Sequence, residues 1–187
     1  DNIVDLIKNS TRCNTKVFCI NELDEKRGMI IRHIWNSDVI PTTHLPDSVE
    51  RNFDDSRFYG FSNLSHIDKI TIEMKHGVNS IAYHFVPIDH NNKIIIYNHG
   101  HDGGFVVGKK TIQFFLEEGY SVLALSMPLI GMNDQPIVDT NFGKIKLLSH
   151  KYFELIENDN FSPMIYFFEP INVSLNYLQK QYNYEEY

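Results

Sequence analysis

A strand, a glycine-rich turn, a helix and a second strand follow one another in one short stretch of this sequence. Residues 94–97 form a continuous β-branched and aromatic run typical of a strand buried on both faces. The turn 99–104 comes next, and residues 109–118 have helical apolar spacing that ends at Gly119. Residues 120–125 then form a second apolar run. This succession has the size of a right-handed βαβ unit, so it predicts two parallel strands and an α/β fold.

The flanking segments predict an antiparallel opening and a helical end. Apolar and polar residues alternate over 70–74 and again over 81–85, with a turn between them, which favours a β-hairpin. A loop is expected at residues 127–143. Helical patterns then cover residues 147–156 and 163–182, and the second of these is amphipathic.

Length and composition indicate one main domain with an N-terminal appendage. The chain has 187 residues, of which 42% are hydrophobic, so it can bury a sizeable core. We expect residues 1–66 to be an extension of mixed short elements, with a helix at 1–8 and short apolar runs at 16–20 and 29–35. Residues 67–187 are expected to form the α/β portion. No apolar run has the length of a membrane-spanning helix.

Charge and cysteine content exclude some classes of partner and leave the compartment open. The net charge is -7, which gives no basic surface for nucleic acid or an anionic membrane. The two cysteines, Cys13 and Cys19, are interpreted as free thiols; a short-loop disulfide is the alternative. No spacing completes a metal site around them.

From residue 67 to residue 182 the order of elements resembles the N-terminal half of the α/β-hydrolase fold. The residues that carry the resemblance are the hairpin 70–85, the strand 94–97, the turn 99–104, and the strand 122–125 with its exit 126–131. The resemblance implies a three-layer α/β-hydrolase-like fold, with a partial, mostly parallel sheet, an antiparallel opening hairpin and flanking helices. It also implies hydrolysis of a small-molecule ester, with no cofactor.

The glycine-rich turn is the candidate site. Glycines after a buried strand allow a sharp turn and bring backbone amides close to a ligand, where they can stabilise an oxyanion. The resemblance implies that His101 occupies the position of the loop's backbone oxyanion donor, with Asp102 following it in the same loop. In the family the second donor comes from the residue after the nucleophile. The substrate-binding neighbours of this loop are expected to be His99, Gly100, Gly103, Gly104 and Met127. The alternative interpretation is a tight strand-to-helix turn with no catalytic role.

The nucleophile of such an enzyme is missing from the sequence. No G-x-S-x-G pentapeptide occurs, and Ser62 lacks the second glycine. Ser126 follows a strand but is succeeded by Met127 and Pro128, so we interpret it as a loop residue at the sheet's carboxyl edge. The acid and histidine of a triad are also unidentified. We therefore expect a truncated, esterase-like hydrolase that is inactive alone.

Two other classes of function stay open. A non-catalytic binding or assembly module would expose the edge of its last strand, which would favour a homo-oligomer or a completing chain. A metal-binding protein would use His99 and His101 as an H-x-H pair. Its further ligands would have to come from His76, His84, His90 or His150.

Overall fold

The computed structural model describes residues 20–182 and residue 184 and divides the chain into two compact units, Asp1–Ile40 and Pro41–Tyr187. The predicted helix at 1–8 and both cysteines lie outside the described residues. In the first unit, α2 (Ile20–Trp35) contains the apolar run 29–35, so that run is helical. No helix in the described ranges combines the length and the apolar character needed to cross a bilayer.

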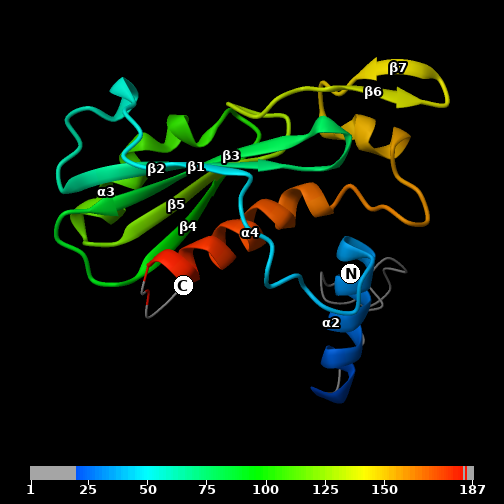
Figure 1. The fold of residues 1–187 in the computed structure, drawn as a ribbon, viewed down its shortest axis with the longest axis horizontal. Coiled ribbons are helices and arrows are strands. Elements are labelled where there is room, and N and C mark those ends of the chain that lie inside the picture. The colour runs from blue at the N-terminus through cyan, green and yellow to red at the C-terminus, as the bar shows by residue number, and fades with distance from the viewer. Residues whose placement is uncertain (1–19, 183, 185–187) are drawn as a thin grey trace, which may run out of the picture. The chain divides into compact units, whose positions relative to one another are not determined.

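The second unit is built on a five-stranded sheet in the order β1-β2-β3-β5-β4 (Figure 1). Its strands are β1 (Ser48–Glu50), β2 (Leu64–Glu73), β3 (Asn79–Pro87), β4 (Ile94–His99) and β5 (Ser121–Ser126). The β2–β3 hairpin and the parallel β4–β5 pair match the sequence-based expectation. The boundary expected after residue 66 falls inside β2.

The expectation of a mostly parallel sheet is wrong. β1 pairs with β2, β2 with β3, and β3 with β5, all antiparallel, so β4–β5 is the one parallel pair among the described strands. The βαβ connection places β5 between β3 and β4. Since a local sequence pattern predicts strands but not the neighbour of each strand, the number of antiparallel pairs was underestimated.

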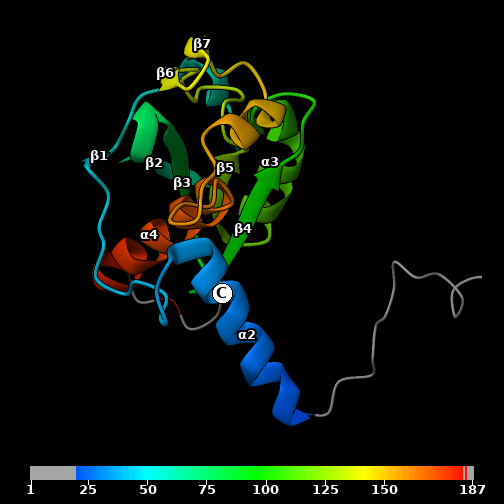
Figure 2. The ribbon, with the colours of Figure 1, turned by 90° about the vertical axis from the view of Figure 1, so that its right-hand side faces the viewer.

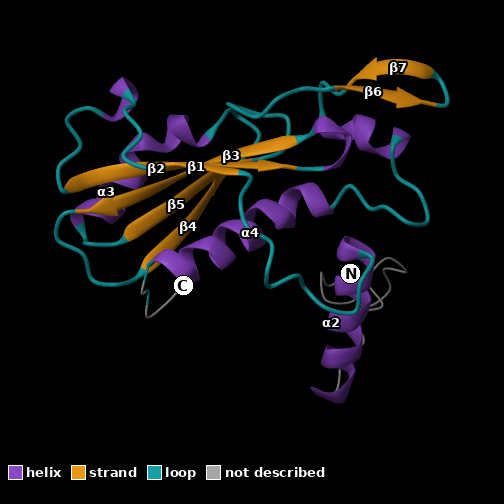
Figure 3. Cartoon of the chain, in the orientation of Figure 1, coloured by secondary structure: helices purple, strands orange, loops and turns teal. Residues whose placement is uncertain are grey.

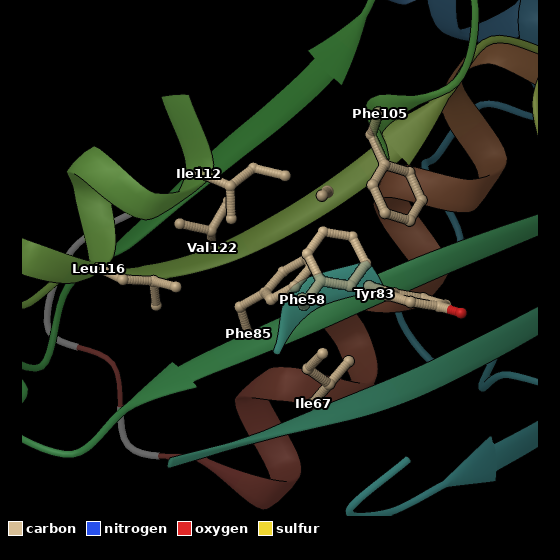
Figure 4. Close-up of a cluster of buried hydrophobic side chains, with 9 residues drawn as sticks. Phe58, Ile67, Tyr83, Phe85, Phe105, Ile112, Leu116 and Val122 are labelled. Carbon is tan, nitrogen blue, oxygen red and sulfur yellow. The ribbon is translucent and has the colours of Figure 1, made fainter. Parts of the chain in front are cut away.

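Helices cover both faces of the sheet (Figures 2 and 3). On one face, α3 (Lys109–Glu117) packs Ile112 and Leu116 against Val122 of β5 (Figure 4). On the other, α4 (Ile165–Gln181) packs Val173 and neighbouring residues against Leu123. Adjacent residues of β5 thus point to opposite helices, as the two-residue period of a strand requires.

Other segments complete the second unit. They are the 3₁₀ turns Ser56–Phe58, Lys75–Gly77, Phe105–Gly108 and His150–Leu155 and the hairpin β6 (Ile137–Thr140) and β7 (Gly143–Lys146). β6 lies within the stretch expected to be a loop, and β7 begins at the last residue of that stretch. The segment expected to be helical at 147–156 contains a 3₁₀ turn at 150–155. A third apolar cluster, which includes Leu129, Val138 and Phe153, packs the segment between β5 and α4 together.

A buried polar pair connects the end of α4 to the sheet. Asp68 of β2 and His84 of β3 are directly opposite in the strand register, and both are fully buried. Tyr182 donates a hydrogen bond to Asp68 (2.5 Å), and the hydroxyl of Tyr184 lies 2.5 Å from Nε2 of His84. Burial disfavours the Asp68 carboxylate, but His84, Tyr182 and the amide of Asn52 outweigh it and lower the pKa of Asp68 to about 2. Burial lowers the pKa of His84, which keeps the imidazole neutral.

β4 forms one edge of the five-stranded sheet and β1 the other, whereas the last strand of this sheet, β5, is internal. We expected the final strand to be exposed and residues 94–97 to be buried on both faces. Instead every residue of β5 is buried, whereas β4 has a neighbour on one side only. Ile94 is 2% exposed and Ile96 is 36% exposed. The apolar run therefore lies on an edge strand of the second unit.

Candidate functional site

The glycine-rich turn leaves the carboxyl end of β4 and is anchored by the residue that follows it. His101 and Asp102 are exposed, whereas Phe105 is fully buried. The Phe105 ring lies 5.0 Å from that of Tyr83 between centroids, and Figure 4 shows it pointing into the cluster beneath α3. The turn is thus fixed at its downstream end, with residues 101 and 102 at the surface.

Ser126 holds this turn against β5. It is the last residue of β5, is 6% exposed, and its hydroxyl accepts a hydrogen bond from the Phe105 amide (3.1 Å). Our interpretation of Ser126 as a loop residue is therefore wrong, although its position at the carboxyl edge is confirmed. Because its oxygen is occupied by the Phe105 amide and it has no histidine partner among the described residues, Ser126 is a structural residue of the turn.

Two glycines allow the turn and the loop after β5 to approach each other. A Cβ added to Gly104 would lie 2.9 Å from the Cα of Gly131 and 3.0 Å from Oγ of Ser126. Gly131 has a φ of 71°, in the left-handed region that favours glycine. The backbones at residues 104 and 131 therefore pack directly on each other, and neither position has room for a side chain.

The backbone amides of His101 and Asp102 are free donors. Within residues 20–182 and 184, neither amide has a hydrogen-bond acceptor, and both residues are exposed. In contrast, the amides of Phe105 and Val107 are bonded, to Ser126 and to the Gly104 carbonyl respectively. Unpaired amides on an anchored turn are what an oxyanion requires, because their direction is fixed before the charge forms.

The two histidines of the turn take different partners. Nδ1 of His99 lies 2.8 Å from the Tyr97 hydroxyl, so this ring is directed back along β4. Nε2 of His101 lies 3.1 Å from Nδ1 of His150. No cluster of three potential metal ligands of the His, Cys, Asp or Glu type exists in the part of the chain described. Of the expected further ligands, His76 bonds to Tyr166 and His84 lies by Tyr184.

The loop after β5 is held by a residue that the sequence analysis did not identify. Asn133 is buried, and its side-chain NH₂ donates to the carbonyl of Met127 (2.9 Å). The Asn133 side-chain oxygen accepts from the Ile81 amide (2.8 Å) of β3. Met127 itself is half-buried directly after β5. The Asn133 link fixes where Met127 lies relative to the sheet, and no sequence signal marks it.

The apolar residues near this loop do not form one acyl pocket. Phe105 belongs to the core beneath α3, Leu129 is 3% exposed within the third apolar cluster, and Phe142 is 81% exposed between β6 and β7. These residues are close to the strand ends in the sequence, but in the structure they lie in two different apolar clusters and at the surface.

The other triad candidates are also separate from the turn. The Ser62 hydroxyl lies 2.5 Å from Glu117 on an exposed turn, as expected for a surface residue. Asp139 is exposed on β6, and Glu169 is half-buried on α4, where burial raises its pKa. A serine, a histidine and a carboxylate do come together on β2, where Ser65 Oγ lies 3.1 Å from Nδ1 of His66 and Nε2 of His66 lies 3.9 Å from Asp68. These residues are not part of the glycine-rich turn. Compared with protein-family models and with curated proteins, the chain matches none.

Proposed function

We propose that the second unit forms the N-terminal portion of an α/β-hydrolase-like domain and that the turn 100–104 supplies the oxyanion donors for ester hydrolysis. The observation that carries the proposal is the pair of exposed, unpaired amides of His101 and Asp102 on an anchored turn. The turn leaves the carboxyl end of a parallel strand, the edge at which α/β sheets bind ligands.

The chemistry assigned to the turn is electrostatic. When a nucleophile adds to an ester carbonyl, the carbon–oxygen π pair moves onto oxygen, and the negative charge needs donors about 2.7–3.1 Å away. Collapse of this intermediate re-forms the carbonyl and expels the alkoxide, which takes a proton. The amides of His101 and Asp102 would hold the oxygen through both steps, with His99, Gly100, Gly103, Gly104 and Met127 around the substrate.

The open edge of β4 supports a nucleophile that comes from a strand outside this sheet. A parallel strand beside β4 would end next to His99 and the turn, where the nucleophile must lie. Among the described strands β4 pairs with β5 alone, so its second edge has no strand partner and could bond a further strand. This supports completion of the sheet at β4.

The test uses a p-nitrophenyl ester and a fluorophosphonate, which labels activated serines. Residues 1–187 alone should give neither serine-dependent turnover nor labelling. The natural full-length protein should be labelled, on a serine outside residues 1–187. Labelling of Ser126, or turnover abolished by Ser126→Ala, would refute the proposal, as would a full-length protein that stays unlabelled.

A second candidate function, a non-catalytic assembly module, is favoured by the same apolar edge of β4. An uncovered edge strand is a template for another strand, so a module of this kind would be a homo-oligomer or bind a completing chain. Light scattering after size exclusion distinguishes the cases. A stable oligomer of the natural protein without serine labelling would favour assembly over hydrolysis, and a monomer would count against it.

A further inference from the structure

Two histidines from distant segments connect the glycine-rich turn to the loop after β5. Nε2 of His101 lies 3.1 Å from Nδ1 of His150, and Nε2 of His150 lies 2.7 Å from the carbonyl oxygen of Pro128. His150 begins the 3₁₀ turn 150–155, and it is separated from His101 by 49 positions. The link thus crosses from the turn after β4 to the exit of β5.

The direction of these hydrogen bonds follows from chemistry. A carbonyl oxygen can only accept, so Nε2 of His150 carries the proton that points at Pro128. In a neutral imidazole the other nitrogen is then an acceptor, so His101 donates from its own Nε2. One tautomer of each ring satisfies both hydrogen bonds, the one from His101 to His150 and the one from His150 to Pro128.

The ring of His150 is held by its surroundings before it meets His101. It stacks on Phe153 with centroids 5.5 Å apart, and Phe167 of α4 packs edge-on at 4.9 Å. His101, by comparison, is exposed and has glycines at positions 100 and 103, which confer little backbone restraint. Among the described contacts of the His101 side chain, the bond to His150 is the one that restrains its position.

We propose that His150 is a positioning residue for the oxyanion turn, acting through the His101 side chain to fix the amides of residues 101 and 102. The inference rests on the proposed function for its catalytic meaning. The Phe105–Ser126 bond fixes the downstream end of the turn, and the histidine link fixes its middle. Both must hold for two exposed amides to keep one direction.

Three substitutions separate the two hydrogen bonds of His150. His150→Phe keeps the aromatic packing and removes both bonds. His150→Asn places an amide at the same bond count as Nδ1 and can still accept from His101. His150→Gln places its amide at the bond count of Nε2 and can reach Pro128 but not His101.

The experiment is nuclear magnetic resonance on residues 1–187, so it needs no enzymatic activity. Nitrogen shifts should show His101 protonated on Nε2, and the order parameter of the Asp102 amide should be about 0.85. In His150→Phe and His150→Gln that value should fall below about 0.6, and His150→Asn should restore it. The Phe105 amide is the internal control, because its bond to Ser126 stays intact in all three variants.

Two results would overturn the inference. One is an Asp102 order parameter that His150→Phe leaves unchanged, and the other is restoration by His150→Gln to the same degree as by His150→Asn. These outcomes are independent of ester hydrolysis. A link that is present in residues 1–187, together with a natural full-length protein that the fluorophosphonate does not label, would refute the proposed function and leave the positioning of the turn established.

Discussion

Replacing Gly104 by alanine tests the close packing that holds the candidate site. The added methyl would lie 2.9 Å from the Cα of Gly131 and 3.0 Å from Oγ of Ser126. Carbon atoms pack best at about 3.5–4.0 Å, and the main obstacle here is backbone that cannot rotate away. Overpacking of this kind costs about 1–3 kcal/mol. We therefore expect Gly104→Ala to destabilise the second unit by that amount.

Gly100→Ala is the matched control in the same turn. A Cβ at Gly100 would have no heavy atom within 4 Å, and its backbone is outside the left-handed region. Such a replacement restricts the unfolded chain, so stability should be unchanged or rise by up to about 1 kcal/mol. The two variants add the same methyl group four residues apart, so their difference isolates the contact with Gly131.

Urea unfolding of both variants provides the measurement. Gly104→Ala should lower the midpoint at an unchanged denaturant slope, and its melting temperature should fall by about 2–4 °C for each kcal/mol. Exchange of the Phe105 amide should also accelerate, since Ser126 must move. Equal midpoints for the two alanine variants would refute the close packing and, with it, the anchoring of the turn.

Three further changes give distinct outcomes. Ser126→Ala leaves the buried Phe105 amide without an acceptor, which should cost about 1–3 kcal/mol in urea unfolding and accelerate exchange of that amide. Acid should destabilise the second unit in two steps. His84, whose pKa burial lowers, loses stability as pH falls below about 6.5, where the unfolded imidazole takes up a proton. Asp68, with its pKa lowered from 3.8 to about 2, contributes about 2 kcal/mol that is present above about pH 4 and lost as pH falls through about 2. Asp68→Asn should remove the Asp68 contribution and, because the Asp68 carboxylate raises the pKa of His84, should enlarge the His84 step. Urea midpoints measured across this pH range check both changes. Ile96→Lys places a charge on the edge strand β4 and should reduce any self-association measured by light scattering. The free energy of unfolding should fall by no more than about 0.5 kcal/mol. Unchanged association would show that β4 is not the contact.

Local patterns in the sequence predicted most elements of the second unit but not the sheet that they form. The hairpin β2–β3, the helix α3, the strand β5 and the helix α4 each have a periodicity that needs no partner to be recognised. Pairing of β5 with β3 is antiparallel and involves residues about 40 positions apart, and no local signal reports it. For the same reason, the sequence did not indicate that β4 would be an edge strand.

The sequence indicated the backbone turn of the candidate site, but it did not indicate the side chains that hold this turn in place. The glycines at 103 and 104 mark the turn, because Gly103 has a φ of 135° and Gly104 packs directly on Gly131. Ser126, Asn133 and His150 act through hydrogen bonds between segments that only the tertiary fold brings together. Ser126 had one available signal, a polar residue at the end of a buried strand, and the other two had none.

Fluorophosphonate labelling of the natural full-length protein tests the central claim most directly. A hydrolase whose oxyanion donors lie at His101 and Asp102 needs a nucleophile serine in a G-x-S-x-G turn at the end of a strand beside β4. We expect the label on such a serine. A full-length protein that stays unlabelled, or one labelled on Ser126, would contradict the proposal.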